Sequence, residues 1–221
     1  EREYNPDRFN GEGAAPIVFE ESFDRVDWSG IGNLAYRFGI GHKIGFKNFY
    51  SRGTEEVFRQ GRGADIGDGP SLNYQGRFVQ RYVGQSQVTG DHYFPFLMDS
   101  RLNWKVSYGQ AGRNDLDNRQ LRYTDVGNGY VISTSQPSYR FNNSLRDKSY
   151  TGQVDWGVPF TLTSDQAGEF KVGGSFRRKD RVFDARAFEL EIGSFPTDLH
   201  DLPPEQLLAP ENLGPGGLGY K

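Results

Sequence analysis

The side chains that could do chemistry in this sequence are three histidines, a few aspartates and a set of arginines and lysines. His42, His92 and His200 are far apart along the chain and form no local metal-binding motif. Asp65 and Asp68 lie in a glycine-rich stretch, but they lack the fuller ligand spacing and the closing glutamate of a calcium loop. We therefore expect no metal site and no cofactor.

Two further aspartates could form the carboxylate pair that a glycoside hydrolase needs. Asp91 and Asp155 both fall on the polar side of alternating segments, where a general acid and a nucleophile or base could face one another. Nothing in the sequence around them indicates the apolar environment that raises a carboxyl pKa. We therefore interpret both as lining a wet surface, predict no catalytic residues and expect that the chain is not an enzyme.

The basic residues are more informative as a set. On the polar side of the alternating segments, eight basic residues stand against three acidic ones, although the whole chain has a net charge of -3. Such a surface could attract an anionic solute, or its cations could pair with carboxylates on neighbouring strands or on another domain, which is the interpretation we favour. The eight are Arg77, Arg81, Arg101, Lys105, Arg113, Lys171, Arg177 and Lys179. The overall charge gives no indication of nucleic-acid binding.

Strands position these side chains, because apolar and polar residues alternate with a period of two. The clearest case is 73–113, in which two alternating runs flank a short turn at 95–99. Shorter runs lie at 28–38, 43–51, 150–158 and 169–192. The first strand of the 73–113 pair could extend for some twenty residues, far beyond the usual length of about 5 to 6. The sequence predicts an all-β fold, an antiparallel meander of about six long strands.

The connections between these strands alternate in length. Those around Gly39, Pro95 and Asp165 are short, whereas 61–72, 114–148 and 193–221 look long and irregular. A small hairpin is predicted at 125–130 and one short helix at 203–208. Short turns at one end and long loops at the other are typical of outer-membrane β-barrels, and we expect the three long segments to project from one edge.

Several of these segments resemble the barrel of a TonB-dependent outer-membrane receptor. The resemblance covers most of 34–212 and consists of runs in which apolar and polar residues alternate. Neither the family's plug domain nor its TonB box is visible. It is carried by the runs Asn33-Leu34-Ala35-Tyr36-Arg37-Phe38, His42 to Arg52, Phe94-Pro95-Phe96-Leu97, Ser100 to Tyr108, Tyr150 to Phe160 and Leu207 to Asn212.

The resemblance implies an active transport receptor of the bacterial outer membrane. Such a barrel has 22 strands around a plug and takes up siderophores, cobalamin or glycan-type ligands with energy supplied through the TonB system. Residues 1–221 would then be an internal fragment, an open slice of a transmembrane β-barrel. Its partners would be outer-membrane lipid, the TonB system through the plug, and a small-molecule or oligosaccharide ligand.

Alternation assigns the two sides of such a barrel wall. The side chains expected to face lipid are Tyr74, Phe78, Tyr82, Leu102, Trp104, Val106, Tyr108, Val154, Trp156, Phe170 and Val172. Those expected to face the lumen are Arg77, Arg81, Arg101, Lys105, Arg113, Asp155, Lys171 and Arg177. Arg177, Arg178 and Lys179 break the alternation, and we expect them to mark a strand end at the surface of the hydrocarbon layer.

The main alternative is a soluble all-β carbohydrate-binding module. In that protein the aromatic side chains would form a platform for sugar rings, and two packed sheets would bury the remaining apolar residues. An all-β enzyme is a third interpretation. A transmembrane barrel slice differs from both because it predicts a single open sheet, with Trp104 and Trp156 on an uncovered face.

Overall fold

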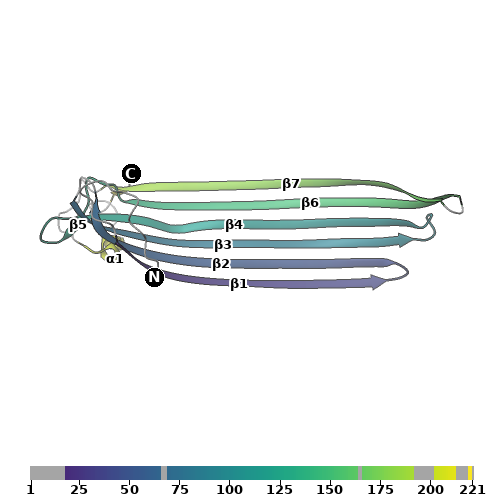
Figure 1. The fold of residues 1–221 in the computed structure, drawn as a ribbon, viewed down its shortest axis with the longest axis horizontal. Coiled ribbons are helices and arrows are strands. Elements are labelled where there is room, and N and C mark those ends of the chain that lie inside the picture. The colour runs from purple at the N-terminus through teal and green to yellow at the C-terminus, as the bar shows by residue number, and fades with distance from the viewer. Residues whose placement is uncertain (1–17, 66–68, 164–165, 192–201, 213–218, 221) are drawn as a thin grey trace.

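A single antiparallel sheet dominates the computed structural model, which describes residues 18–65, 69–163, 166–191, 202–212 and 219–220. Six long strands of 21 to 26 residues follow one another as neighbours (Figure 1). They are β1 (Val18–Phe38), β2 (His42–Asp65), β3 (Gly69–Phe94), β4 (Ser100–Asp125), β6 (Tyr139–Thr163) and β7 (Gln166–Glu191). The first and last of them do not pair. The predicted all-β meander, open and not closed into a barrel, is confirmed.

The strands are longer than expected, so two of the predicted connections are wrong. Residues 60–65 belong to β2 and 69–72 to β3, which leaves three residues between these strands instead of a long loop at 61–72. Most of 114–148 is also strand, because β4 continues to Asp125 and β6 begins at Tyr139. Sustained cross-strand pairing overrides the polar composition that suggested loops. The predicted hairpin is confirmed, since Asp125 pairs with Tyr130 of β5 (Tyr130–Ile132).

Tight turns close the other end of the sheet. Gly39 and Gly41 adopt φ values of 54° and 86°, the left-handed conformation that favours glycine, as the sequence predicts. In the turn between β3 and β4, Met98 and Asp99 adopt φ values of 52° and 55°. There Leu97 N–H donates to Phe94 C=O, and the Tyr93 hydroxyl donates to Asp99. These contacts hold two non-glycine residues in a strained backbone conformation.

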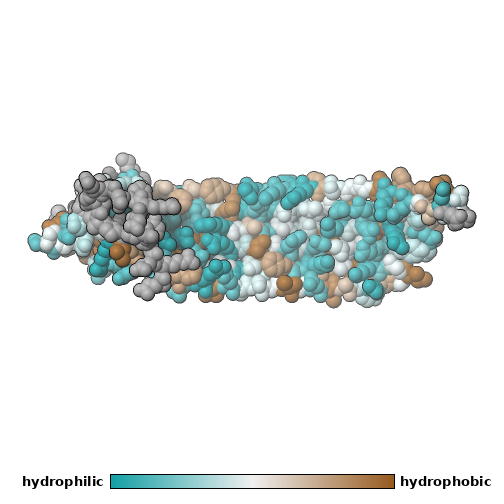
Figure 2. Space-filling model, viewed as in Figure 1, coloured by the Kyte–Doolittle hydropathy of each residue, from teal (hydrophilic) through white to brown (hydrophobic). Residues whose placement is uncertain are grey.

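Continuous register gives the sheet two faces with different chemistry. Directly paired residues share a face, and the register of β1, β2, β3, β6 and β7 places their even-numbered residues on one side, up to a register shift after Thr161 at the end of β6. In β4 the same side holds even residues up to Asn114 and odd residues from Asp117, because a bulge inserts Leu116. We call this side the aromatic face and the other the polar face. On the side seen in Figure 2, hydrophilic residues predominate over the strands.

Four aromatic rings on the aromatic face lie against glycines of the neighbouring strand. The directly opposed pairs are Tyr50 with Gly84, Tyr82 with Gly112, Trp104 with Gly90 and Phe160 with Gly168. A β-carbon built on any of these glycines would contact or overlap the opposing ring. The rings therefore lie flat over the backbone, an arrangement that fixes register and shields hydrogen bonds beside the glycine.

The only cluster of buried apolar residues in the described part of the chain lies at the end of the sheet with the longer connections. Leu72, Leu121, Tyr123 and Leu190 of the sheet pack there with Ile132 and with Leu207, which is 1% exposed. Leu207 belongs to α1 (Pro204–Leu207), the predicted helix; η2 (Pro210–Asn212) follows, and β8 (Gly219–Tyr220) pairs with β7.

The C-terminal segment thus folds back onto the sheet, and the expectation that all of 193–221 projects as a loop is wrong. The Tyr123 hydroxyl donates to the carbonyl oxygen of Leu202 at 2.9 Å, which helps to hold 202–212 against the strands. Residues 192–201 lie outside the described part of the chain. No helix among the described residues is long and apolar enough to cross a membrane.

Replacing Gly90 with valine tests the aromatic–glycine packing. A side chain there displaces the Trp104 ring, and overpacking of this kind costs about 1–3 kcal/mol of unfolding free energy. Gly152→Val is the matched control, because Gly152 lies on the same face with open space around its α-carbon. Denaturant unfolding of the two variants measures the difference. Equal stability of the two variants would contradict the packing described here.

Candidate functional site

One half of the aromatic face forms a continuous uncharged surface, which we call the apolar band. Trp28, Tyr50, Tyr82, Tyr108 and Tyr150 form a line across five neighbouring strands, and the band extends from this line to the tight turns. Arg52 and Arg178 lie on this face level with the line, but between the line and the tight turns no described residue of the strands on this face is Asp, Glu, Lys or Arg. Its larger members are Leu34, Tyr36, Phe38, Ile44, Phe46, Val88, Phe94, Leu102, Trp104, Val106, Val154, Trp156, Val158, Phe160, Phe170, Val172 and Phe176.

The band is open to its surroundings, and its aromatic edge is ordered by ring contacts. Leu34 is 72% exposed, Phe170 59% and Val106 56%, so no second layer covers these side chains. The rings of Trp28 and Tyr50 lie 5.2 Å apart between centroids, as do those of Tyr108 and Tyr150. Contacts at this distance are within the favourable range for aromatic pairs.

At the other edge of the band, register brings together two histidines that are 50 residues apart. The sequence shows no local motif that joins His42 and His92, but His42 pairs directly with His92 across β2 and β3. Their Nδ1 atoms are 3.2 Å apart, and Trp104 Nε1–H donates to His92 Nε2 at 3.0 Å. With Nε2 accepting, the proton of a neutral His92 is on Nδ1 and is donated to His42.

Two sets of polar side chains inside the band are hydrogen-bonded, whereas the buried Ser100 hydroxyl has no partner among the described residues. The histidine pair satisfies the Trp104 indole, and the Ser86 hydroxyl donates to Asn48 Oδ1 at 2.6 Å on directly opposed residues. The tautomer that accepts from Trp104 leaves neither His92 nitrogen free for a metal ion. The described residues contain no group of three or more His, Asp or Glu that could hold one.

The polar face carries an open groove behind the apolar band. Side chains from five neighbouring strands, β1 to β4 and β6, line a depression of about 480 Å³. Its polar lining residues are Asn33, Lys43, Lys47, Thr89, Asp91, Asn103, Lys105, Gln153 and Asp155. These polar residues all have odd numbers, so the depression lies on the opposite side of the sheet from the apolar band.

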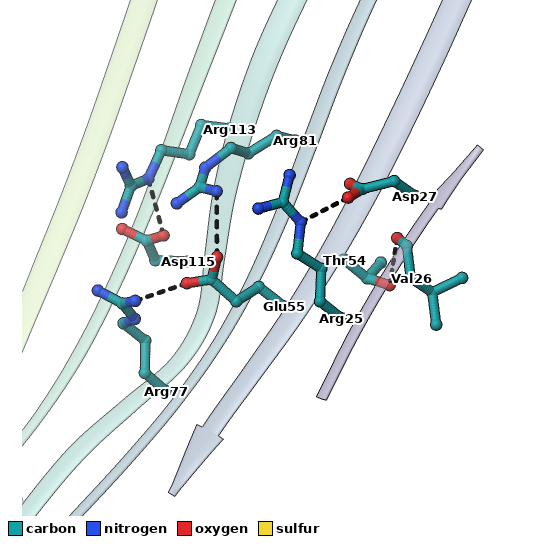
Figure 3. A network of polar contacts seen from close by, with 9 residues as sticks. All are labelled: Arg25, Val26, Asp27, Thr54, Glu55, Arg77, Arg81, Arg113 and Asp115. Carbon is teal, nitrogen blue, oxygen red and sulfur yellow. Dashed lines mark hydrogen bonds and ion pairs between the residues drawn. The ribbon is translucent and has the colours of Figure 1, made fainter. Parts of the chain in front are cut away.

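A belt of ion pairs crosses the polar face beyond the groove, and every long strand contributes to it. Glu55, whose side chain is 13% exposed, accepts from Arg77 at 2.6 Å and from Arg81 at 3.4 Å (Figure 3). Arg113 donates to Asp115 at 3.0 Å, and Asp115 also accepts from the amide of Asn143. The favoured interpretation of these arginines, pairing across neighbouring strands, is confirmed for Arg77 and Arg81.

Asp147 is the carboxylate of this belt with the clearest electrostatic perturbation. Arg181 donates to it at 2.7 Å and Lys179 lies 3.0 Å away, both from the neighbouring strand β7. These hydrogen bonds, Arg181 first and Lys179 second, lower the pKa of the Asp147 carboxyl below its ordinary value of 3.8. Asp147 lies beyond Tyr150 along β6, outside the band.

The structure places all eight predicted lumen residues on the polar face, together with Asp91 and Glu169. Arg101 lies over the Tyr93 ring and Lys171 pairs with Glu169 at 3.0 Å. Asp91 and Asp155 lie at one level on β3 and β6, each opposite Asn103 of β4. Two strand spacings, about 10 Å of backbone, separate them.

All eleven predicted lipid-facing residues share the aromatic face, but two lie outside the band. Tyr74 and Phe78 are at a level where charged side chains such as Glu56 and Asp117 occupy the same face, and Tyr74 packs edge-on against Tyr123. The nine others lie within the band or on its aromatic line. His200 and Asp68 fall outside the described residues, and Asp65 ends β2.

Arg178 does not mark a strand end, and that expectation is wrong. β7 continues to Glu191, and Arg178 is paired with Tyr150 on the aromatic line, where it contacts Asp180 at 3.2 Å. The analysis of the sequence also missed Trp28, Tyr50 and the carboxylates Glu55, Asp115 and Asp147. Only the strand register aligns these residues, and register depends on strand ends that composition obscured.

Acid titration tests the role of Asp147. Its pKa is lowered in the folded state, so its stabilising contribution is complete above the unfolded-state pKa, near 3.8, and is lost as the pH falls through the lower folded-state value. The wild-type protein should lose more unfolding free energy than Asp147→Asn between pH 5 and pH 2, as measured by denaturant titration. Parallel pH profiles for the two proteins would contradict this role.

No protein-family model matches the chain, and no curated protein matches it. What the chain does is therefore argued from its two faces: an apolar band with an aromatic edge, and a polar surface with a groove and an ion-pair belt.

Proposed function

We propose that the chain forms part of the wall of an outer-membrane β-barrel, with the apolar band in contact with lipid and the polar face lining the lumen. The observation that carries the proposal is the contrast between the two faces: an exposed apolar band on one and a polar, ion-paired surface on the other. A soluble sheet buries its apolar face in a core. A barrel wall in a membrane instead turns its apolar side chains towards lipid and its polar side chains towards the lumen.

The absence of charge from the band supports this placement. A charged side chain facing lipid at the bilayer midplane costs about 2–4 kcal/mol, so a lipid-facing surface excludes Lys and Arg. Hydrogen bonds between His92 and Trp104 and between Ser86 and Asn48 fit the same environment, because lipid offers no partner for a free polar group. A soluble protein with this exposed apolar surface would associate or aggregate.

The height of the band agrees with a bilayer core. On β1 the band extends from Trp28 to Phe38, ten residue steps and about 33 Å along the strand at about 3.3 Å per residue. A strand tilt of about 40° reduces this length to about 25 Å, the height of the apolar belt on outer-membrane barrels. Aromatic residues at both edges fit the membrane interfaces.

Within this class, we propose a TonB-dependent receptor that takes up siderophores, cobalamin or glycan-type ligands. The proposal rests on the resemblance of 34–212 and on strands that continue 10 to 17 residues beyond the aromatic line, enough to form walls outside the membrane. The lumen would be lined by the groove and by Arg101, Lys105, Lys171 and Arg177. The groove lysines Lys43 and Lys47 and the aspartates beside them would contact a plug domain.

Energised uptake tests the transport assignment. Deleting the segment from the gene in its own host should abolish accumulation of one labelled ligand class, siderophore-bound iron, cobalamin or oligosaccharide, to the level seen with a proton-motive-force uncoupler. Unchanged uptake of all three classes would overturn the receptor assignment while leaving the membrane placement to be tested separately.

The runner-up is a soluble carbohydrate-binding module, for which exposed rings such as Trp28 and Tyr36 are the favourable observation. Such a module needs a buried core under its aromatic platform, whereas the described residues on the opposite face are mostly polar. A water-soluble monomer that binds oligosaccharides through the band would favour the module.

Arginine substitution on the two faces tests the membrane placement. Val154→Arg puts a charge in the middle of the band, and we expect it to lower folding stability in lipid vesicles by about 2–4 kcal/mol. Gln153→Arg is the matched control on the polar face, with an expected cost near zero. Urea titration of the two variants in vesicles of the same lipid gives the comparison. Equal costs for both would contradict the assignment of the faces.

A further inference from the structure

A group of cations lies on the aromatic face just beyond the aromatic line, on strands β6 and β7. Arg178 of β7 is directly opposite Tyr150 of the aromatic line. On β6, Lys148 is the next residue on this face beyond Tyr150, and Arg146 is the one after it. Alternate residues share a face, so the three side chains form a row on the aromatic face in which Lys148 lies between Arg178 and Arg146, over about 13 Å of strand. Arg146 and Arg178 are exposed and Lys148 is half-buried. We call these three residues the cation patch.

The acidic neighbours of the cation patch do not neutralise it. Asp180 is opposite Lys148 and contacts Arg178 at 3.2 Å, and it is the only carboxylate level with the patch on either flanking strand. Gln110 and Gly112 of β4 and Val182 of β7 are the other directly paired residues. Asp184 is one pair further along, opposite Ser144. Three cations against Asp180 leave a surplus of two positive charges.

The patch occurs at only one of the two edges of the apolar band. At the edge beside the tight turns, the described residues of the aromatic face include no Lys, Arg, Asp or Glu. A surface that served solubility alone would carry charges at both edges. The asymmetry indicates that the two edges meet different surroundings, and only the edge away from the tight turns favours anions.

We propose that the cation patch binds the phosphate group of a membrane lipid in the leaflet on the side of the longer connections. This inference rests on the proposed membrane placement and names a partner for that surface. Two guanidinium groups and one ammonium group suit a phosphate monoester, since arginine donates paired hydrogen bonds to phosphate oxygens and lysine adds a point charge. The lipid tail would lie along Tyr150 and Phe176, and the phosphate beside Arg178.

Energy transfer from the protein's tryptophans to a pyrene-labelled lipid tests the proposal. The chain is refolded in phosphatidylcholine vesicles that contain a trace of pyrene-labelled phosphatidic acid or, in a parallel sample, pyrene-labelled phosphatidylcholine. At about 1 kcal/mol per basic residue near the membrane surface, the surplus of two positive charges predicts that phosphatidic acid is enriched around the wild-type protein by about thirtyfold over phosphatidylcholine. The triple variant Arg146→Gln, Lys148→Gln, Arg178→Gln should lose this enrichment.

Arg177→Gln is the matched control, because Arg177 has the same charge, is adjacent in sequence and lies on the opposite face. Full enrichment with this control and loss with the triple variant support the proposal. Enrichment that survives in the triple variant, or that falls equally in the control, overturns it. Loss of enrichment on adding millimolar inorganic phosphate assigns the patch to a dissolved anion and also overturns it. Failure to insert into phosphatidylcholine alone would instead overturn the membrane placement.

Discussion

The structure depends on unbroken pairing register across six strands of 21 to 26 residues. Side chains alternate strictly along a strand, so a slip of one residue between any two strands would exchange the faces of everything beyond it. Such a slip between β4 and β6 would bring Lys105 beside Val154 and break the aromatic line at Tyr108 and Tyr150. The charge-free band and the ion-pair belt can exist only on opposite sides of one continuous register.

Three structural features stabilise this register. Flat rings opposite glycines, such as Trp104 over Gly90, accept only one alignment of their strands. Cross-strand ion pairs, such as Glu55 with Arg77 and Arg81, penalise misalignment on the other face. The bulge at Leu116 shifts the parity of β4 once, and this shift places Leu121 on the aromatic face, opposite Tyr74 and within the buried cluster. Each face thus contributes its own constraint on the register.

The alternating pattern was sufficient to predict the all-β meander, the six long strands, the open sheet and the parity of the proposed site residues. It was not sufficient to predict strand ends, because segments such as 114–125 are paired by their backbone while their side chains have loop-like composition. The contact of His42 with His92 also could not be predicted from the sequence, because it depends on the register between two strands whose ends the sequence did not define. Residues 202–212 were predicted as a helix in a loop, but their packing on Tyr123 required the fold.

The unpaired edges and the uncovered band follow from the same architecture. Among the described residues, β1 has no partner on its outer side, and β7 pairs beyond β6 only through Leu190 and Glu191. In water these edges and the exposed rings favour association with further strands. The proposed placement in a barrel wall resolves both features, because neighbouring strands would satisfy the edges and lipid would cover the rings.

Tryptophan quenching tests this placement most directly, because Trp28, Trp104 and Trp156 are the only tryptophans and all lie on the aromatic face. The protein is refolded in vesicles whose acyl chains carry bromine, and the quenching is compared with that by acrylamide in water. We expect strong quenching by the brominated lipid and weak quenching by acrylamide. Strong quenching by acrylamide with none from the brominated chains would show that the band faces water and would contradict the account.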